Sequence, residues 1–279
     1  MVRIITDSTS DLSAAYAEEH NLKLVPLSVH FGAESFRDGL DLTNREFYAK
    51  LTQAETLPTT AQVNPEEFQS LFQAAIDAGD QVLGIFLSSD LSGTYQSACI
   101  ARDMVEGGEI HLIDSRSVTF GLGLLVDRAL TLRQGGATGG EIAAAIRGLV
   151  GRLRLYAVVD TLKYLKMGGR ISSATAMVGG LLGITPIVSV QNGLVEAVGK
   201  ARGRKAAFRW MEERLQEEQP DLSLPVAFGH TDAPDAMEEC RSFFAPALAG
   251  AKTLTGEIGS VVGTHAGPGA TGFAYFSKN

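Results

Sequence analysis

Short apolar segments alternate with amphipathic ones over roughly the first 150 residues, and this alternation restricts the fold more than any other feature of the sequence. A helix between two strands returns the chain to the same end of a sheet, so the strands that it joins pair in parallel. The pattern therefore predicts an α/β fold with a parallel sheet between layers of helices. The expected strands are 2–6, 22–31, 81–87 and 109–114, and the main expected helices are 11–20, 65–78, a segment from Gly93, a segment ending at Gly135-Gly136 and about 140–150.

The regular alternation of expected strands and helices ends near residue 153. A strand over 153–160 is followed by a glycine-broken segment, 167–183, with a helical middle, and then by a hairpin whose turn is Asn192-Gly193. Helices near 203–218 and 233–249, a strand near 225–232 and two final strand-like runs complete the pattern. We therefore expect a parallel αβα domain over 1–153 and a mixed-sheet α/β domain over 154–279.

Charge and motif content exclude several classes of function. A net charge of −8 and a pI near 5.2 do not suit a protein that neutralises nucleic-acid phosphates. No apolar run approaches the ~20 residues of a membrane span, and the start of the sequence lacks the regions of a signal peptide. Two cysteines and five scattered histidines show no metal-ligand spacing, so we expect no metal. The glycine-rich segments 193–201 and 267–272 fail as nucleotide-binding motifs, so we expect no cofactor, and a reducing cytoplasm is the simplest location.

Two hydroxyl-bearing segments each precede an expected helix. Thr60 lies ahead of Asn64-Pro65, and Ser92 precedes Gly93, where a missing side chain would let a ligand approach the backbone. Helix N-termini attract anions, and the loops at the carboxyl ends of parallel strands tend to converge. Ser and Thr also cap helices routinely, so both interpretations remain open. His265, in a glycine-rich stretch, is either structural or a donor to a carboxylate.

Two basic clusters and two apolar segments also leave alternatives. The first basic cluster is Lys163, Lys166 and Arg170, and a solvated helix face explains its two lysines, whereas the denser second cluster indicates an external anion. Its members are Lys200, Arg202, Arg204, Lys205 and Arg209. The apolar segments 118–126 and 176–184 are either plain core or the lining of a slender cavity.

Several blocks of the sequence, taken together, resemble the DegV family. They are "TDSTSDL", "TAQVNPEEF", "LSGTYQSA", "LKYLKMGGRIS", "GLLGITPIVSVQNG", "KARGRKA" and "GPGA", and they span nearly the whole chain. The family is similar to the fatty-acid-binding (FakB) subunit of bacterial fatty acid kinase. The resemblance implies a two-domain α/β fold with a long-chain fatty acid held between the domains.

The resemblance also assigns roles to individual residues. It implies that Thr60, Ser92 and His265 bind the fatty-acid carboxylate, and that Arg170 and Arg202 form the kinase-docking or phosphate environment. Ala61 and Val63 depart from the family pattern, which commonly has Ser and Pro there. The ATP-binding subunit of the kinase would be a separate partner, and the product would be an acyl phosphate for phospholipid synthesis.

The resulting expectation is a cytoplasmic fatty-acid-binding protein that is not itself an enzyme and has neither stable membrane insertion nor a nucleic-acid partner. One alternative is a serine-dependent acyl-ester hydrolase that uses Ser92 and His265. Another is a sensor that binds a phosphorylated metabolite at the basic cluster around Arg202.

Overall fold

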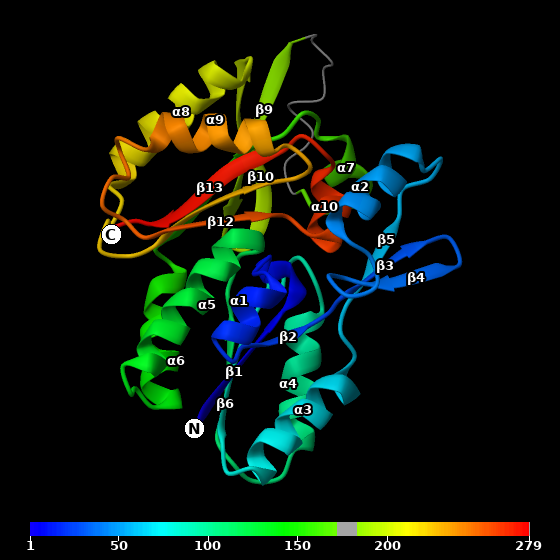
Figure 1. Cartoon of the computed structure of the whole chain (residues 1–279), viewed down its shortest axis with the longest axis vertical. Helices are drawn as coiled ribbons and strands as arrows, with labels where there is room; N and C mark the ends of the chain where they lie inside the picture. The colour runs from blue at the N-terminus through cyan, green and yellow to red at the C-terminus, as the bar shows by residue number, and fades with distance from the viewer. Residues whose placement is uncertain (172–182, 279) are drawn as a thin grey trace.

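The computed structural model describes residues 1–171 and 183–278, and its N-terminal part contains a parallel sheet of four strands in the order β2-β1-β6-β7. The strands are β1 (Val2–Asp7), β2 (Lys23–Val25), β6 (Gln81–Phe86) and β7 (Ile110–Asp114). The helices of this part are η1 (Ser8–Ser10), α1 (Ala14–Glu19), α3 (Pro65–Asp77), α4 (Thr94–Met104), α5 (Thr119–Gln134) and α6 (Gly139–Val150). α3 and α4 cover one face of the sheet and α5 and α6 cover the other (Figure 1). The predicted αβα layers are confirmed.

Alternate residues of β1 face opposite layers, because side chains along a strand point alternately to its two faces. Ile4 packs into the apolar cluster that contains the buried leucines of α5, and Ile5 packs with Phe68 and Phe72 of α3. Both isoleucines are fully buried. The parallel sheet is therefore covered on both faces, as its almost continuous apolar strands require.

A second sheet has six strands in the order β10-β9-β8-β13-β11-β12. They are β8 (Leu153–Val158), β9 (Ile184–Gln191), β10 (Leu194–Arg202), β11 (Val226–His230), β12 (Thr253–Glu257) and β13 (Thr271–Phe276). β11 and β12 are parallel, and the other neighbours are antiparallel. Helices α8 (Arg204–Glu218) and α9 (Pro234–Phe244) cover one face of this sheet (Figure 1). The mixed sheet and the β9–β10 hairpin confirm the prediction, and Asn192 and Gly193 have the positive φ angles, 50° and 84°, of its tight turn.

Helix α5 packs against both large sheets. It contacts β1 and β6 on one side and β11 and β13 on the other. From Thr119 to Val126 its buried residues lie all around the helix rather than along one stripe, and a helical segment that is apolar on every side must be enclosed. α5 is therefore the structural link between the two sheets.

A third, antiparallel sheet, in the order β4-β3-β5, corrects two expectations. Its strands are β3 (Ser28–Phe31), β4 (Glu34–Arg37) and β5 (Thr59–Ala61), and α2 (Asn44–Gln53), α7 (Lys163–Met167) and α10 (Ser260–Ala266) lie near it (Figure 1). The single strand expected over 22–31 is two strands in different sheets, separated at Pro26, which has no N–H for a ladder hydrogen bond. Thr60 lies in β5, where it pairs with Val29, and not in a loop.

The expected helical middle of 167–183 and most of the apolar segment 176–184 fall outside the described residues. Within 1–171 and 183–278, no helix has the length and apolarity that crossing a membrane would demand.

The double packing of α5 predicts a large loss of stability when its core is truncated. Leu124 of α5 is fully buried, so Leu124→Ala should lower the free energy of unfolding by about 2–5 kcal/mol through the cavity it leaves. Urea unfolding followed by circular dichroism measures the change. Leu40→Ala, at a residue that is 63% exposed, is the control and should change stability by less than about 0.5 kcal/mol. Similar unfolding midpoints for the two variants would contradict the central role of α5.

Candidate functional site

A cavity lies where the carboxyl ends of the parallel strands face the mixed sheet. Counted as the space open to the centre of a water molecule, its volume is about 200 Å³. Segments that follow β1, β6 and β7 supply one wall, which includes Leu87, Leu91 and Phe120, and β8–β10 supply another, which includes Leu155 and Val188. In the order β2-β1-β6-β7, the chain passes from β1 to β2 on one side and then returns to β6 on the other side of β1, so the direction of the strand order reverses at β1. Ligands of open α/β sheets bind at the carboxyl ends beside such a reversal, so the topology itself creates the cavity here.

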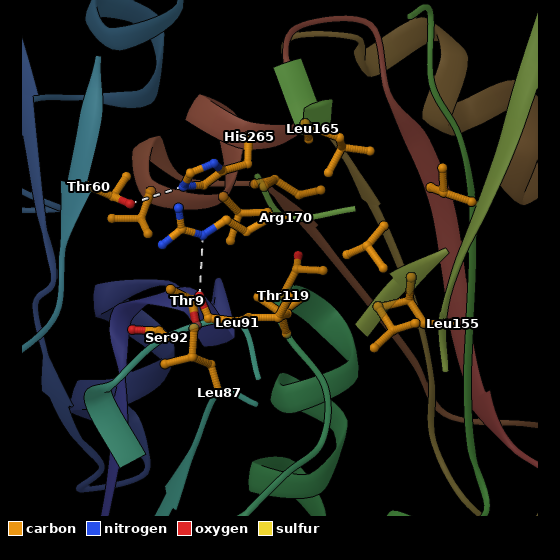
Figure 2. A pocket seen from close by; sticks show the side chains of 18 of the residues that line it. Thr9, Thr60, Leu87, Leu91, Ser92, Thr119, Leu155, Leu165, Arg170 and His265 are labelled. Carbon is orange, nitrogen blue, oxygen red and sulfur yellow. Dashed lines mark hydrogen bonds between the residues drawn. The ribbon is translucent and has the colours of Figure 1, made fainter. Parts of the chain in front are cut away.

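Polar side chains gather at one end of this cavity (Figure 2). Thr60, Ser92, His265 and Arg170 all line it, although they come from β5, the loop before α4, α10 and the segment after α7. Oγ1 of Thr60 and Nε2 of His265 are 3.0 Å apart. Nε of Arg170 donates to the carbonyl of Leu91 at 3.4 Å. The structure therefore brings together four of the five site residues expected from the sequence.

The fifth expected residue, Arg202, does not line the cavity. It is exposed at the end of β10, where it pairs with Ile184. Any role of Arg202 must therefore concern a molecule that approaches from solvent. Arg170 is also exposed, but it borders the cavity.

Two roles were left open for Ser92 by the sequence, capping a helix and lining a binding site, and the structure is compatible with both. Oγ of Ser92 accepts the backbone N–H of Thr94 at 3.3 Å and lies 3.0 Å from Oγ1 of Thr94, so it helps to cap α4. The same residue lines the cavity. Gly93 also lines the cavity. A Cβ at Gly93 would collide with the carboxamide of Gln62, so the side chain of Gln62 fills the space directly beside this glycine.

His265 is a neutral group at the polar end of the cavity. Burial, and then the positive charge of Arg170, lower the pKa of His265 to about 4. Its Nδ1 atom is buried and has no hydrogen-bond partner among the described residues. A Cβ at Gly168 would collide with this nitrogen, so glycine is needed where α7 ends against the ring. Near pH 7 the imidazole has one N–H donor and one acceptor nitrogen, and Nε2 is already close to the hydroxyl of Thr60.

Two carboxyl groups distant in sequence fix the helix that carries His265. Oδ1 of Asp11 accepts the N–H of Gly259 at 2.8 Å, and Oδ1 of Asp38 accepts the N–H and the hydroxyl of Ser260 at 2.9 and 2.6 Å. These bonds satisfy N–H groups at the start of α10 that would otherwise be unpaired. Asp11 belongs to the "TDSTSDL" block, whereas no signal in the sequence marks Asp38.

Asp7, another residue of that block, supports the floor of the cavity. Its carboxyl accepts the backbone N–H groups of Thr9 and Leu87 at 3.0 and 2.8 Å and the hydroxyl of Thr9 at 2.5 Å. Burial raises the pKa of Asp7 to about 6. Thr9 and Leu87 both line the cavity, so Asp7 holds two wall segments in register without lining it.

The tip of the β9–β10 hairpin closes against the parallel sheet. The hydroxyl of Ser88 donates to the carbonyl of Gly193 at 2.7 Å, and the guanidinium of Arg116 donates to the carbonyl of Asn192. Val188 and Val195 of the same hairpin line the cavity. The hydrogen bonds at the tip therefore hold an apolar wall in place.

The two departures from the family pattern have different surroundings. Ala61 lines the cavity, and Val63 is buried in the apolar cluster around α3. Val63 thus serves the core, and Ala61 leaves a methyl group where a hydroxyl was expected.

The geometry gives no support to an esterase site. Within the described residues, the side chain of Ser92 is hydrogen-bonded to Thr94 and that of His265 to Thr60, so no hydrogen bond links the nucleophile to the base. The part of the chain that the structure describes also has no group of three or more His, Cys, Asp or Glu side chains placed to hold a metal ion.

The lowered pKa of His265 predicts that the stability of the protein without a bound ligand depends on pH. Between the unfolded pKa of about 6.5 and the folded value of about 4, the unfolded chain binds a proton that the folded chain excludes. The stability that His265 contributes is therefore fully present above the unfolded value and is lost as the pH falls, by up to about 3 kcal/mol.

Urea unfolding of the wild type and of His265→Asn at several pH values between 7 and 4 measures this effect. The difference between the two proteins cancels other titrating groups, including Asp7. We expect the wild type to lose stability relative to the variant as the pH falls. Two parallel stability curves would show that His265 titrates normally in the folded protein.

Comparisons with known proteins agree with this architecture. The chain matches, over residues 1–278, the family model described as an uncharacterised protein of the DegV family. A DegV domain-containing protein of Caldanaerobacter subterraneus subsp. tengcongensis is 36% identical over 278 residues, and the alignment covers 99% of both chains.

Solved structures with the same fold are described as fatty-acid-binding proteins. A fatty-acid-binding DegV family protein from Thermus thermophilus has a TM-score of 0.89 and 32% identity, with 99% of both chains covered. A stearic-acid-binding protein from Eubacterium ventriosum has a TM-score of 0.88 and 28% identity, covering 100% of this chain and 99% of its own. DegV, a fatty acid binding protein from Bacillus subtilis, has a TM-score of 0.87 and 30% identity, with 99% of both chains covered. The match along the whole sequence and the shared two-sheet fold show that this chain belongs to the DegV family.

Proposed function

We propose that the protein binds one long-chain fatty acid in this cavity, with the carboxylate at Thr60, Ser92 and His265 and the alkyl tail between the two sheets. One observation carries the proposal: a single cavity joins these polar groups at one end to apolar walls supplied by both sheets. The fatty-acid-binding descriptions of similar structures support it.

The head-group end suits an ionised acid. A carboxylate accepts hydrogen bonds only. When the N–H of His265 is on Nε2 and donates to Oγ1 of Thr60, the hydroxyls of Thr60 and Ser92 can both donate to the carboxylate. Hydrogen bonds to a charged group contribute roughly 1.5–3 kcal/mol each. The guanidinium of Arg170 adds a positive charge beside the same end. Because a bound carboxylate favours the protonated imidazole, it should also raise the pKa of His265 above its value in the lipid-free protein.

The tail supplies most of the binding free energy. Each buried methylene contributes ~0.8 kcal/mol, so a dozen contribute about 10 kcal/mol before the cost of association is subtracted. The apolar walls come from several elements rather than from one groove, and they can enclose the tail on more than one side. Affinity then depends on the tail, and orientation depends on the head.

We further propose that the bound acid is presented to a separate ATP-dependent fatty acid kinase. A carboxylate oxygen of the acid would attack the γ-phosphorus of ATP, the bond from that phosphorus to the bridging oxygen of ADP would break, and acyl phosphate and ADP would form. The exposed guanidinium of Arg170 borders the head-group end, and the exposed Arg202 is available to a partner or a phosphate. The failure of both glycine-rich segments as nucleotide motifs is consistent with a kinase active site on another chain.

Organic extraction of the purified protein, followed by mass spectrometry, tests the first proposal directly. We expect a long-chain fatty acid in a ratio close to one per chain. Protein that carries no lipid and does not take up added fatty acid would refute the assignment.

Removal of the head-group hydroxyls should weaken binding of the acid. Thr60→Val and Ser92→Ala should each reduce the affinity for a fatty acid about tenfold, because each removes one charge-assisted hydrogen bond. Displacement of a fluorescent fatty acid measures the change. The methyl ester of the same acid is the matched control, since it has no charged head and its weaker binding should change little. Equal losses for acid and ester would indicate damage to the cavity instead.

Arg202 should affect phosphorylation but not binding. Arg202→Ala should leave the fatty-acid affinity unchanged, because the side chain does not line the cavity, and should reduce acyl-phosphate formation with the kinase at least tenfold. Arg45→Ala, which removes another exposed arginine, on α2, is the control and should leave turnover unchanged. Unchanged turnover in Arg202→Ala would exclude its role at the kinase interface.

A further inference from the structure

Thr119 is a polar residue on the apolar side of the cavity. It lines the cavity and is only 4% exposed, yet its hydroxyl oxygen has no hydrogen-bond partner among the described residues. Figure 2 shows the side chain pointing into the cavity between the head-group residues and Leu155. A buried hydroxyl without a partner is unfavourable, so its position calls for a group that can pair with it.

The same residue begins helix α5, whose N-terminus opens onto the cavity. Val118, Thr119 and Phe120 all line it, and the N-cap residue, Val118, has no side chain that could cap the helix. The N-terminus of a helix of this length carries a partial positive charge. The hydroxyl and the helix end therefore both favour an electron-rich atom at one point of the cavity.

The backbone of Thr119 is strained. Its φ angle is 50°, and a β-branched residue rarely adopts this left-handed region. The next residue is tightly packed, since a Cβ at Gly229 would collide with the ring of Phe120. The unusual backbone conformation of Thr119 therefore lies beside a side chain that has little room to move.

Asp11 is a competing partner inside the protein. The Thr119 hydroxyl interacts with the Asp11 carboxyl and lowers its pKa, against the larger effect of burial, which raises it. This contact lacks full hydrogen-bond geometry, because within residues 1–171 and 183–278 neither Oδ2 of Asp11 nor Oγ1 of Thr119 has a partner that meets it. Asp11 does not line the cavity, so a better-placed acceptor inside the cavity would compete with it for the hydroxyl hydrogen.

We propose that Thr119 and the N-terminus of α5 form a second polar subsite, which recognises an oxygen atom carried along the acyl chain. The ligand class is a hydroxy or oxo fatty acid, with its carboxylate at Thr60, Ser92 and His265. This inference rests on the proposed function and specifies its substrate. An oxygen on the chain would accept the hydroxyl hydrogen of Thr119, while the remaining carbons contact the apolar walls.

Competition binding with stearic acid and hydroxystearic acids tests the inference. The hydroxyl is placed at successive carbons, so that one isomer presents it at the depth of Thr119. We expect at least one isomer to bind the wild-type protein about three- to tenfold more tightly than stearic acid, as one additional hydrogen bond allows. No isomer better than stearic acid would overturn the inference.

Two variants that differ by one oxygen atom complete the test. Thr119→Ser keeps the hydroxyl and should keep the preference, whereas Thr119→Ala should lose it and bind stearic acid at least as tightly as the wild type. A preference that survives in Thr119→Ala would also overturn the inference. Circular dichroism and thermal unfolding check that both variants fold. If one variant does not fold, the relative affinities of the wild-type protein for stearic acid and the hydroxystearic acids decide the test. Wild-type protein that binds none of these acids would instead refute the proposed function.

Discussion

The enclosure of α5 between two sheets is the constraint on which the rest of the structure depends. Because the N-terminal half of this helix is apolar on every side, it can be stable only if both sheets cover it, and their separation follows from its thickness. The cavity occupies the space that the helix leaves beyond its N-terminal end, where the sheets continue but the helix does not. Val118, Thr119 and Phe120 mark that limit. The same helix, α5, thus fills the core between the sheets and forms one boundary of the cavity.

The buried polar groups fall into two sets with different roles: carboxyl groups that position the backbone and other polar groups that line the cavity. Asp11 and Asp38 hold α10 through its first N–H groups, and Asp7 ties the loop after β1 to the end of β6. These carboxyl groups lie outside the cavity lining, and the polar groups that line the cavity include hydroxyls, the carboxamide of Gln62, a neutral imidazole and Arg170. Acidic groups position the site, while donors and one positive charge face its contents. This separation avoids the repulsion that a carboxylate in the lining would exert on an anionic ligand.

The sequence predicted those parts of the fold that local patterns encode. Apolar alternation predicted the parallel sheet, and Asn192-Gly193 predicted the hairpin because both residues tolerate a positive φ. The strands β3 to β5 are too short to show a period, and α10 contains Gly263, a poor helix former packed against Tyr48, so tertiary contacts and the distant Asp38 determine it. For the candidate site, motif resemblance predicted Thr60, Ser92 and His265, which line one cavity in the structure. It could not show that Thr60 lies in a strand, that Gln62 covers Gly93 or that Thr119 faces the cavity, because these depend on packing between distant segments.

The contact between Thr60 and His265 joins residues 205 positions apart in the chain. Contacts of such separation close a very long loop, and they form only once most of the intervening structure is in place. A partly folded chain would therefore lack the contact between Thr60 and His265. Since a ligand shifts an equilibrium toward whichever state binds it, any ligand held between these residues would stabilise the native state as a whole, not either sheet alone. Occupancy of the site and completion of the fold are thermodynamically one coupled equilibrium.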